Sequence, residues 1–308
     1  MSGGGKKVRK SLLELLLAAI IICPSLKAQK IYSYDTVTPL NVPVLYEHGI
    51  ITTDNTNEFG ITFSPDGKEV FFTRQNFREE PLMKIYHARY EKGMWTNPEV
   101  APFSGQYEDN DPMFSPDGQT LFFCSKRPTP QNPEKRDFDI WMVKRTSGGW
   151  SKPIHLGESV NVDGYDDLFV SVTQDGTLYF ASNRPASYGE MDIFRARVQN
   201  GKYLAAENIG NPVNSEAREA NPFVSRDEKM LIFYSDRPGG FGWIDLYISF
   251  NEGGKWSPPV NLGEVINTPD LDFSPYISPN GKYFFFARRK NKIVNLFQVN
   301  IDVLPRFK

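Results

Sequence analysis

The sequence has 308 residues, of which 40% are hydrophobic and 14% are aromatic, and its formal net charge is −2. An acidic chain is a poor candidate for a nucleic-acid-binding protein, because such proteins neutralise phosphates with clustered lysine and arginine. With two cysteines, the chain also lacks the disulfide framework of small secreted domains.

The first 28 residues have the layout of a secretory signal peptide, with a basic start and then an apolar run over residues 12–22. That run is too short to span a bilayer comfortably. We expect cleavage after Ala28, which leaves 30 basic and 36 acidic residues and a net charge of −6. Lipid anchoring at Cys23 is the alternative. No later segment is apolar for long enough to form a membrane helix, so we expect a periplasmic or secreted protein.

One short turn motif then recurs five times, at intervals of 51, 58, 52 and 53 residues. Its copies occupy residues 63–67, 114–118, 172–176, 224–228 and 277–281. Proline at one corner, present in three of the copies, and Asp-Gly or Asn-Gly at the other corner favour a tight turn. Glu228 replaces the glycine in the fourth copy, so we expect that turn to be strained or of another type.

A first predicted strand precedes each turn, and a second, β-rich strand follows it. A polar loop then leads to a third predicted strand, and a further turn leads to a fourth. The fourth stretch follows an aromatic residue in four of the five units, namely Trp95, Trp150, Tyr203 and Trp256. Four short strands per unit, without an amphipathic helix, predict an all-β fold with a single five-bladed β-propeller over residues 29–308. The predicted repeats span approximately 58–106, 107–161, 162–214, 215–267 and 268–304; six blades are the less favoured alternative. We expect the four aromatic residues to pack between blades and Cys124 to be a small core residue.

The two ends of the chain are expected to meet. Residues 43–53 resemble residues 259–268, the fourth strand of the fourth unit, whereas the fifth unit lacks an aromatic-led fourth strand. The segment 43–53 is therefore predicted to complete the last blade, which leaves no open edge strand.

Three sequence features together carry a family resemblance: Ser-Pro-Asp-Gly after an aromatic residue, the segment 235–240 (Ser-Asp-Arg-Pro-Gly-Gly), and 245–247 (Asp-Leu-Tyr). In combination they resemble the WD40-like repeat of TolB-type propellers, over nearly all of the mature chain. The resemblance implies a periplasmic or surface-exposed binding scaffold without catalytic residues. Members of that family often have six blades and an additional domain, whereas this sequence contains five repeats.

Every repeat carries a carboxylate nine residues before the end of its turn. These residues are Glu58, Asp109, Asp167, Glu219 and Asp272. The first strand of a blade is innermost, so we expect them to circle one mouth of the channel. The second strand ends at the same face and supplies Arg74, Arg127, Arg184, Arg237 and Arg289. One arginine per acid favours structural pairing; convergence on Ca²⁺ or a cationic ligand is the alternative.

The loops at the same mouth contain the aromatic residues Phe77, Tyr188, Phe241 and Trp243 and the further acids Asp111, Asp163 and Asp166. Aromatic residues beside carboxylates predict a binding face for a protein or a glycan of the cell envelope. The alternative is that these rings only cap their own blades. Acids before the third strand, Asp139, Asp192 and Asp245, are expected to fix these loops.

Catalytic motifs are missing from the sequence, and the three histidines have no metal-ligand spacing. The enzyme alternative is a glycoside hydrolase that uses carboxylates at the channel mouth, with Asp109, Asp167 and Asp272 as the candidates. We favour a monomeric, exported, non-enzymatic binding protein with no nucleic-acid partner and no cofactor. A binding protein that depends on a Ca²⁺ ion in the ring is a further alternative.

Overall fold

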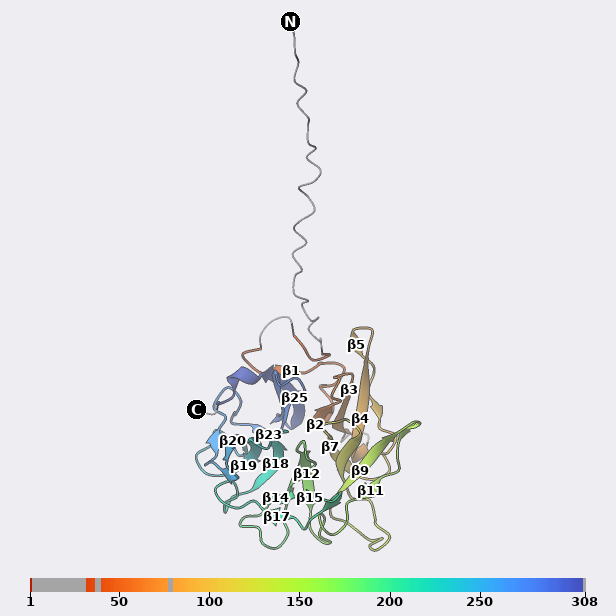
Figure 1. Cartoon of the computed structure of the whole chain (residues 1–308), viewed down its shortest axis with the longest axis vertical. Coiled ribbons are helices and arrows are strands. Elements are labelled where there is room, and N and C mark those ends of the chain that lie inside the picture. The colour runs from red at the N-terminus through yellow and green to blue at the C-terminus, as the bar shows by residue number, and fades with distance from the viewer. Residues whose placement is uncertain (2–31, 37–39, 77–79, 307–308) are drawn as a thin grey trace. The chain divides into compact units, whose positions relative to one another are not determined.

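The computed structural model describes residue 1 and residues 32–36, 40–76 and 80–306. The predicted signal segment and Phe77 lie outside the described residues. Within the described part of 32–306 the chain forms five antiparallel sheets of four or five strands and one two-stranded ribbon. The first strands of the five larger sheets surround a central axis, and their later strands lie progressively further out (Figure 1). The predicted five-bladed, all-β propeller is confirmed.

The first two blades follow one plan, in which a three-stranded meander is extended by two short outer strands. Blade 1 consists of β2 (Asn57–Phe63), β3 (Glu69–Asn76), β4 (Glu80–Glu91), β5 (Met94–Trp95) and β6 (Glu99–Val100). Blade 2 consists of β7 (Asp109–Phe114), β8 (Thr120–Ser125), β9 (Asp139–Thr146), β10 (Gly149–Trp150) and β11 (Ile154–His155).

Blades 3 and 4 keep this plan with small variations. Blade 3 consists of β12 (Asp167–Val172), β13 (Leu178–Ser182), β14 (Asp192–Ala196) and β17 (Glu207–Asn208), with a small ribbon of β15 (Val198–Gln199) and β16 (Lys202–Tyr203). Blade 4 consists of β18 (Glu219–Val224), β19 (Met230–Ser235), β20 (Asp245–Glu252), β21 (Lys255–Trp256) and β22 (Val260–Asn261).

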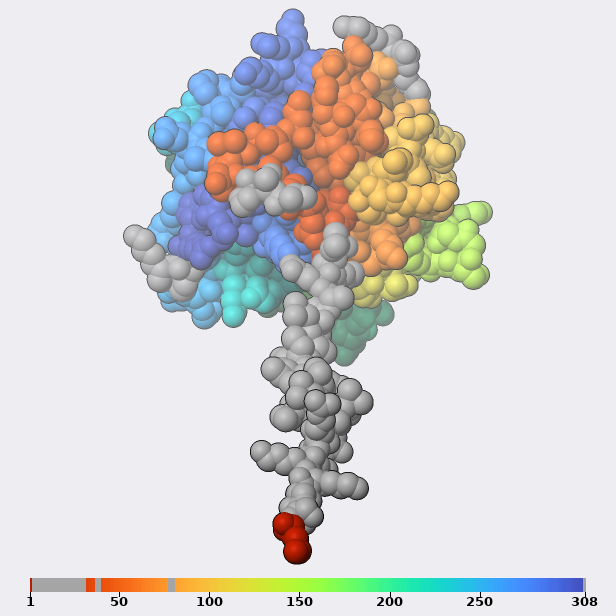
Figure 2. Space-filling model, turned by 90° about the horizontal axis from the view of Figure 1, so that it is seen from above, coloured from red at the N-terminus to blue at the C-terminus, as the bar shows by residue number. Residues whose placement is uncertain are grey.

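Blade 5 combines both ends of the chain. It contains β23 (Leu271–Ile277), β24 (Tyr283–Lys290), β25 (Ile293–Asn300) and, as its outer strand, β1 (Val44–Leu45). Val44 pairs with Gln298 in antiparallel register. The N-terminal strand thus closes the last blade as predicted, although only two residues of the segment 43–53 form a strand. In Figure 2, the orange N-terminal residues lie beside the blue ones of the last blade.

The repeated turns join the first and second strands of each blade at one end of the propeller. Ser64 shows their chemistry, because its hydroxyl bonds the Asp66 carboxylate and accepts the Glu69 amide. Gly67 then takes a positive φ of 71°, which glycine adopts without steric cost. Glu228 occupies the position of this glycine in the fourth turn, with a φ of 58°. Its amide donates to the Ser225 carbonyl, as the Gly67 amide donates to that of Ser64. The prediction of strain is confirmed there, and the turn type is unchanged.

The core consists of apolar side chains packed between adjacent sheets. Trp150 of blade 2 lies edge-on to Phe71 of blade 1, at 5.9 Å between ring centroids, and Trp256 of blade 4 meets Tyr179 of blade 3 at 6.1 Å. Cys124 is fully buried, as predicted. The only helix in the described ranges is the 3-10 turn η1 (Ile301–Val303), and no helix there is long and apolar enough to cross a membrane.

Candidate functional site

The first strand of each blade begins at the end of the propeller where loops connect the second strand to the third. We call this end the loop face. It comprises residues 126–138, 183–191, 236–244 and 291–292 and the first residues of the inner strands. The five predicted carboxylates lie there, and all are fully buried. Each bonds one arginine: Glu58 with Arg74 (2.9 Å), Asp109 with Arg127 (2.7 Å), Asp167 with Arg184, Glu219 with Arg237 (2.9 Å) and Asp272 with Arg288 (2.6 Å). The predicted pairing is confirmed.

One partner was predicted wrongly. Arg288, and not Arg289, stands opposite Asp272 in the register of β23 and β24. Successive side chains of a strand point to opposite faces, so the one-residue difference moves the guanidinium away from the acid. Arg289 instead lies opposite Leu271 and is exposed at the channel mouth.

Each arginine also bonds the segment that connects its blade to the preceding blade. The second guanidinium contact of each is a backbone carbonyl: Ile51, Phe103, Val160, Val213 and Ile266 for Arg74, Arg127, Arg184, Arg237 and Arg288. Each guanidinium also lies over aromatic rings of its own blade, as Arg184 does over Phe180 and Phe194 at 5.1 and 4.9 Å. Such fork-shaped, stacked contacts suit arginine and not lysine.

The remaining carboxylate oxygens of this ring are also occupied. The second oxygen of Asp109 accepts the Ser104 hydroxyl, and that of Asp167 accepts the Val162 amide. Burial raises the pKa of Glu58 and of Asp167 to about 6 each, even with an arginine beside them. The ring therefore presents no free oxygen to the channel.

The catalytic candidates Asp109, Asp167 and Asp272 all belong to this ring. A glycoside hydrolase needs two carboxyl groups that flank the substrate in an open cleft, whereas each of these three is buried against its own arginine. Across the described ranges, no group of three or more His, Cys, Asp or Glu is placed to hold a metal ion.

A second level of the inner strands differs from blade to blade. Every inner strand has a bulge where the register with the second strand shifts. The residues at these bulges all have positive φ: Gly60 (59°), Asp111 (46°), Phe169 (61°), Asn221 (48°) and Ser274 (53°). A bulge redirects a side chain, and these five residues line the narrow waist of the channel, which holds about 30 Å³.

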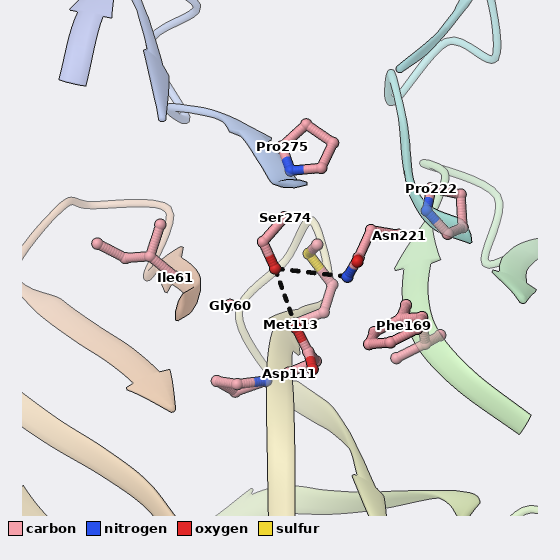
Figure 3. A pocket seen from close by; sticks show the side chains of 11 residues that line it. Gly60, Ile61, Asp111, Met113, Phe169, Asn221, Pro222, Ser274 and Pro275 are labelled. Atoms are coloured by element: carbon pink, nitrogen blue, oxygen red, sulfur yellow. Dashed lines mark hydrogen bonds between the residues drawn. The ribbon is translucent and has the colours of Figure 1, made fainter. Parts of the chain in front are cut away.

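A polar cluster crosses this waist (Figure 3). The Ser274 hydroxyl donates to Asp111 Oδ1 at 3.2 Å, and the Asn221 amide lies 3.4 Å from the same hydroxyl. Gly60 makes room for the acid, because a Cβ there would stand 2.6 Å from Asp111 Oδ1. Asp111 was predicted to lie in a loop; it lies instead in β7, inside the channel.

Two buried oxygens at this level have no hydrogen-bond partner among the described residues, Asp111 Oδ2 and Asn110 Oδ1. The residues are 6% and 3% exposed. Burial raises the pKa of Asp111 to about 7. An unpaired buried polar atom is costly, and both of these residues line the hollow that opens toward the loop face.

The channel widens from the waist to the loop face into a hollow of about 470 Å³. Most of its wall is apolar: Phe59, Met83, Phe138, Leu168, Phe169, Ile244, Phe273 and Val294. Arg289 and Lys292 stand at this mouth together with Asn57 and Gln75. A smaller hollow of about 250 Å³ lies at the opposite mouth. The waist between them holds about 30 Å³, close to the volume share of one water molecule in the liquid, so it is the smallest of these three spaces.

The predicted loop aromatics stand at the loop face. Trp243, Tyr188 and Phe241 are 71%, 61% and 48% exposed. Their loops are held as predicted: Asp192 accepts the Tyr188 and Gly189 amides, and Asp245 accepts the Phe241 and Gly242 amides.

Blade 2 holds its loop differently from blades 3 and 4. Asp139 bonds the side chains of Lys135 (3.0 Å) and His155 (2.7 Å) in place of loop amides. The two other predicted loop acids connect loops: Asp163 accepts from Asn132, and Asp166 accepts the Phe138 amide.

Sequence reasoning missed the importance of Asp111 and Asn110. One available signal was the position two residues beyond each ring acid, where the five repeats carry Gly60, Asp111, Phe169, Asn221 and Ser274. Proline follows that position in three repeats, as expected for a bulge in a strand.

Comparison with known proteins supports the architecture. TolB from Acinetobacter baumannii is 18% identical over 81% of this chain and 56% of its own, with a TM-score of 0.51. The putative TolB from Agrobacterium tumefaciens is 18% identical over 81% of this chain and 79% of its own, with a TM-score of 0.53. Hydrazine synthase from Kuenenia stuttgartiensis matches at 11% identity over 82% of this chain and 38% of its own, with a TM-score of 0.51.

The chain spans little more than half of the length of the Acinetobacter protein. No protein-family model and no curated protein sequence matches it. Identities this low speak for the fold alone, and function has to be argued from the site. The chain is a five-bladed β-propeller with the TolB-like fold.

Proposed function

We propose that this protein is an exported, non-enzymatic binding protein that engages a ligand or a protein of the cell envelope at its loop face. The observation that carries the proposal is the hollow of about 470 Å³ at the loop-face mouth, with an apolar wall and polar groups at its floor. Concave apolar sites with a few directed polar groups are the usual form of ligand sites.

Exposed aromatic rings on the loop face favour a binding role. Trp243 and Tyr188 are the most exposed large aromatic side chains among the described residues. Tryptophan and tyrosine combine a large apolar surface with a polar tip and are enriched at interfaces. Gly242 and Gly189 let the loops that carry Trp243 and Tyr188 pack closely against the following blade. A Cβ at either glycine would clash with backbone oxygens of that blade.

Export is proposed from the sequence, which begins with a basic stretch and an apolar run ahead of the propeller. Binding is preferred to hydrolysis because the three candidate carboxylates each hold an arginine and are fully buried. The role of TolB-like propellers as scaffolds agrees with this preference, as an analogy of fold.

Site-directed photo-cross-linking in cells of the source organism tests the proposal. A photoreactive residue replaces Trp243 in one variant and Met94 in the other; Met94 is 65% exposed in the outer strand β5 and serves as the matched control. We expect a discrete cross-linked species from position 243 and none from position 94. Identical patterns at the two positions, or no species at 243, would contradict the proposal.

A further inference from the structure

The floor of the loop-face hollow carries an acid that the protein itself does not satisfy. Asp111 Oδ1 accepts from Ser274, whereas Oδ2 has no partner among the described residues. Asn110 Oδ1, from the preceding residue of β7, likewise has no partner among the described residues. Asp111 and Asn110 both line the hollow, and two acceptors without a donor suit a group that has several hydrogens to give.

The ring acids show that this fold can satisfy a buried carboxylate. Asp109, two residues before Asp111, bonds Arg127 and Ser104. The residues that face Asp111 across the waist are Ser274, Asn221 and Gly60, and none of them is cationic. The counter-charge for Asp111 is therefore expected to come from outside the chain.

The wall above the floor is suited to an apolar body attached to a cation. Phe59 and Phe273 lie 6.1 Å apart between ring centroids, and Phe169 borders both the waist and the hollow. Aromatic faces attract ammonium groups, and more strongly in desolvated sites. The waist, at about 30 Å³, leaves no room for the apolar body, so such a ligand would stop with its head group beside Asp111.

We propose that the hollow binds a primary amine carried on an apolar body, which enters head first so that its ammonium donates to Asp111 Oδ2 and Asn110 Oδ1. This inference rests on the proposed function, because it assigns a ligand class to the same mouth. Ammonium has three donors and no acceptor, which matches two free oxygens flanked by aromatic rings.

A divalent metal fits this site poorly. Calcium requires six to eight oxygen ligands and magnesium a near-ideal octahedron, whereas the floor offers two free side-chain oxygens within an apolar wall. Arg289 and Lys292 at the rim do not exclude an amine, because both are exposed and solvent screens exposed charges.

Calorimetric titration of the purified full chain at pH 8 tests the inference with three probes of equal length: hexylamine, hexanol and hexanoate. We expect hexylamine to bind at least about tenfold more tightly than the other two, the amount that a charged hydrogen bond contributes. Asp111→Asn should weaken hexylamine binding by about the same factor and leave hexanol unaffected. Asp117→Asn, in the turn at the other end of β7, is the matched control and should change nothing.

The pH dependence gives a second readout that does not depend on a variant. Hexylamine affinity should fall as the pH is lowered from 8 to 5, because Asp111 takes up a proton near pH 7 while the amine stays charged. The other titratable groups that act on Asp111 through space are Cys124 and Tyr234; burial raises the pKa of both, that of Tyr234 to about 12. Neither of them titrates in this range.

Equal binding of hexylamine and hexanol, or an Asp111→Asn variant that binds hexylamine as the wild type does, would overturn the inference. In that case a cross-link at position 243 would still support the proposed function. Absence of binding by hexylamine would overturn the inference as well, and only the additional absence of that cross-link would count against the loop face itself.

Discussion

Two levels of the same inner strands behave in opposite ways. At the start of each strand stands an acid, repeated in all five blades and bonded to an arginine in all five. Two residues further along stands the bulge position, where glycine, aspartate, phenylalanine, asparagine and serine replace one another. The first level is symmetric and satisfied; the second is asymmetric and leaves Asp111 Oδ2 without a partner.

We interpret this contrast as the difference between a packing requirement and the proposed binding site. A requirement that every blade meets in the same way, such as attachment to its neighbour, selects the same residues five times. A small, asymmetric ligand on the axis of the propeller contacts each blade in a different way. Different blades therefore need different residues to bind it. In a repeat protein, the position where the repeat is broken among buried polar residues is therefore the better guide to a site.

The largest expected effect comes from breaking the symmetric level. Arg184→Ala leaves Asp167 buried without its cation, and loss of one partner of a buried ion pair costs about 3–5 kcal/mol. Urea denaturation at pH 7 measures the change in the free energy of unfolding. Arg197→Ala, whose side chain is 52% exposed beside Glu207, is the control and should cost less than about 1 kcal/mol. Similar losses for the two variants would show that the ring does not hold the blades together.

Substitution of Asp111, in the asymmetric level, should raise the free energy of unfolding, whereas substitution in the ring lowers it. The pKa of Asp111 is raised from 3.8 to about 7, so its neutral form stabilises the fold below about pH 4, and this contribution is lost as the pH rises through 7. Asp111→Asn stays neutral and should be more stable than the wild type at pH 8, by up to ~4 kcal/mol. The difference should shrink toward pH 4. It is read from urea denaturation of both proteins at several pH values, and a variant less stable than wild type at pH 8 would refute the account.

A smaller effect is expected from the glycine that faces Asp111. Gly60→Ala adds a Cβ 2.6 Å from Asp111 Oδ1 at a φ of 59°. Gly281→Ala has a similar φ of 70° and open space around the new methyl group, so it reports the backbone cost alone. We expect Gly60→Ala to lose about 1–3 kcal/mol more than Gly281→Ala, the usual cost of overpacking. Equal thermal stabilities of the two variants would show that the waist accommodates a methyl group at position 60.

Much of the architecture could be predicted because it repeats. The five turn motifs gave the number of blades, and the likeness of residues 43–53 to 259–268 gave the closure by β1. The spacing of nine residues placed the ring acids at one level, because strands with the same start and the same turn align. Periodic features average out local uncertainty, and each copy supports the others.

The features specific to one blade could not be read in this way. Two adjacent arginines, Arg288 and Arg289, satisfy the spacing equally well, and only the register of β24 shows which one faces Asp272. Asp111 depends on a bulge, which is a mismatch between two strands and not a property of either sequence. The partner of an acid and the direction of a side chain at a bulge are both set by packing across the sheet.

The closure by β1 also orders the events of folding. Val44 pairs with Gln298, and Asn300 bonds the carbonyl of Leu40, so the last blade joins residues that are synthesised at opposite ends of the chain. Contacts of this separation form late, after the local meanders, because closing so long a loop is slow. Blades 1 to 4 can assemble as the polypeptide emerges, whereas the ring stays open until the C-terminal strands arrive.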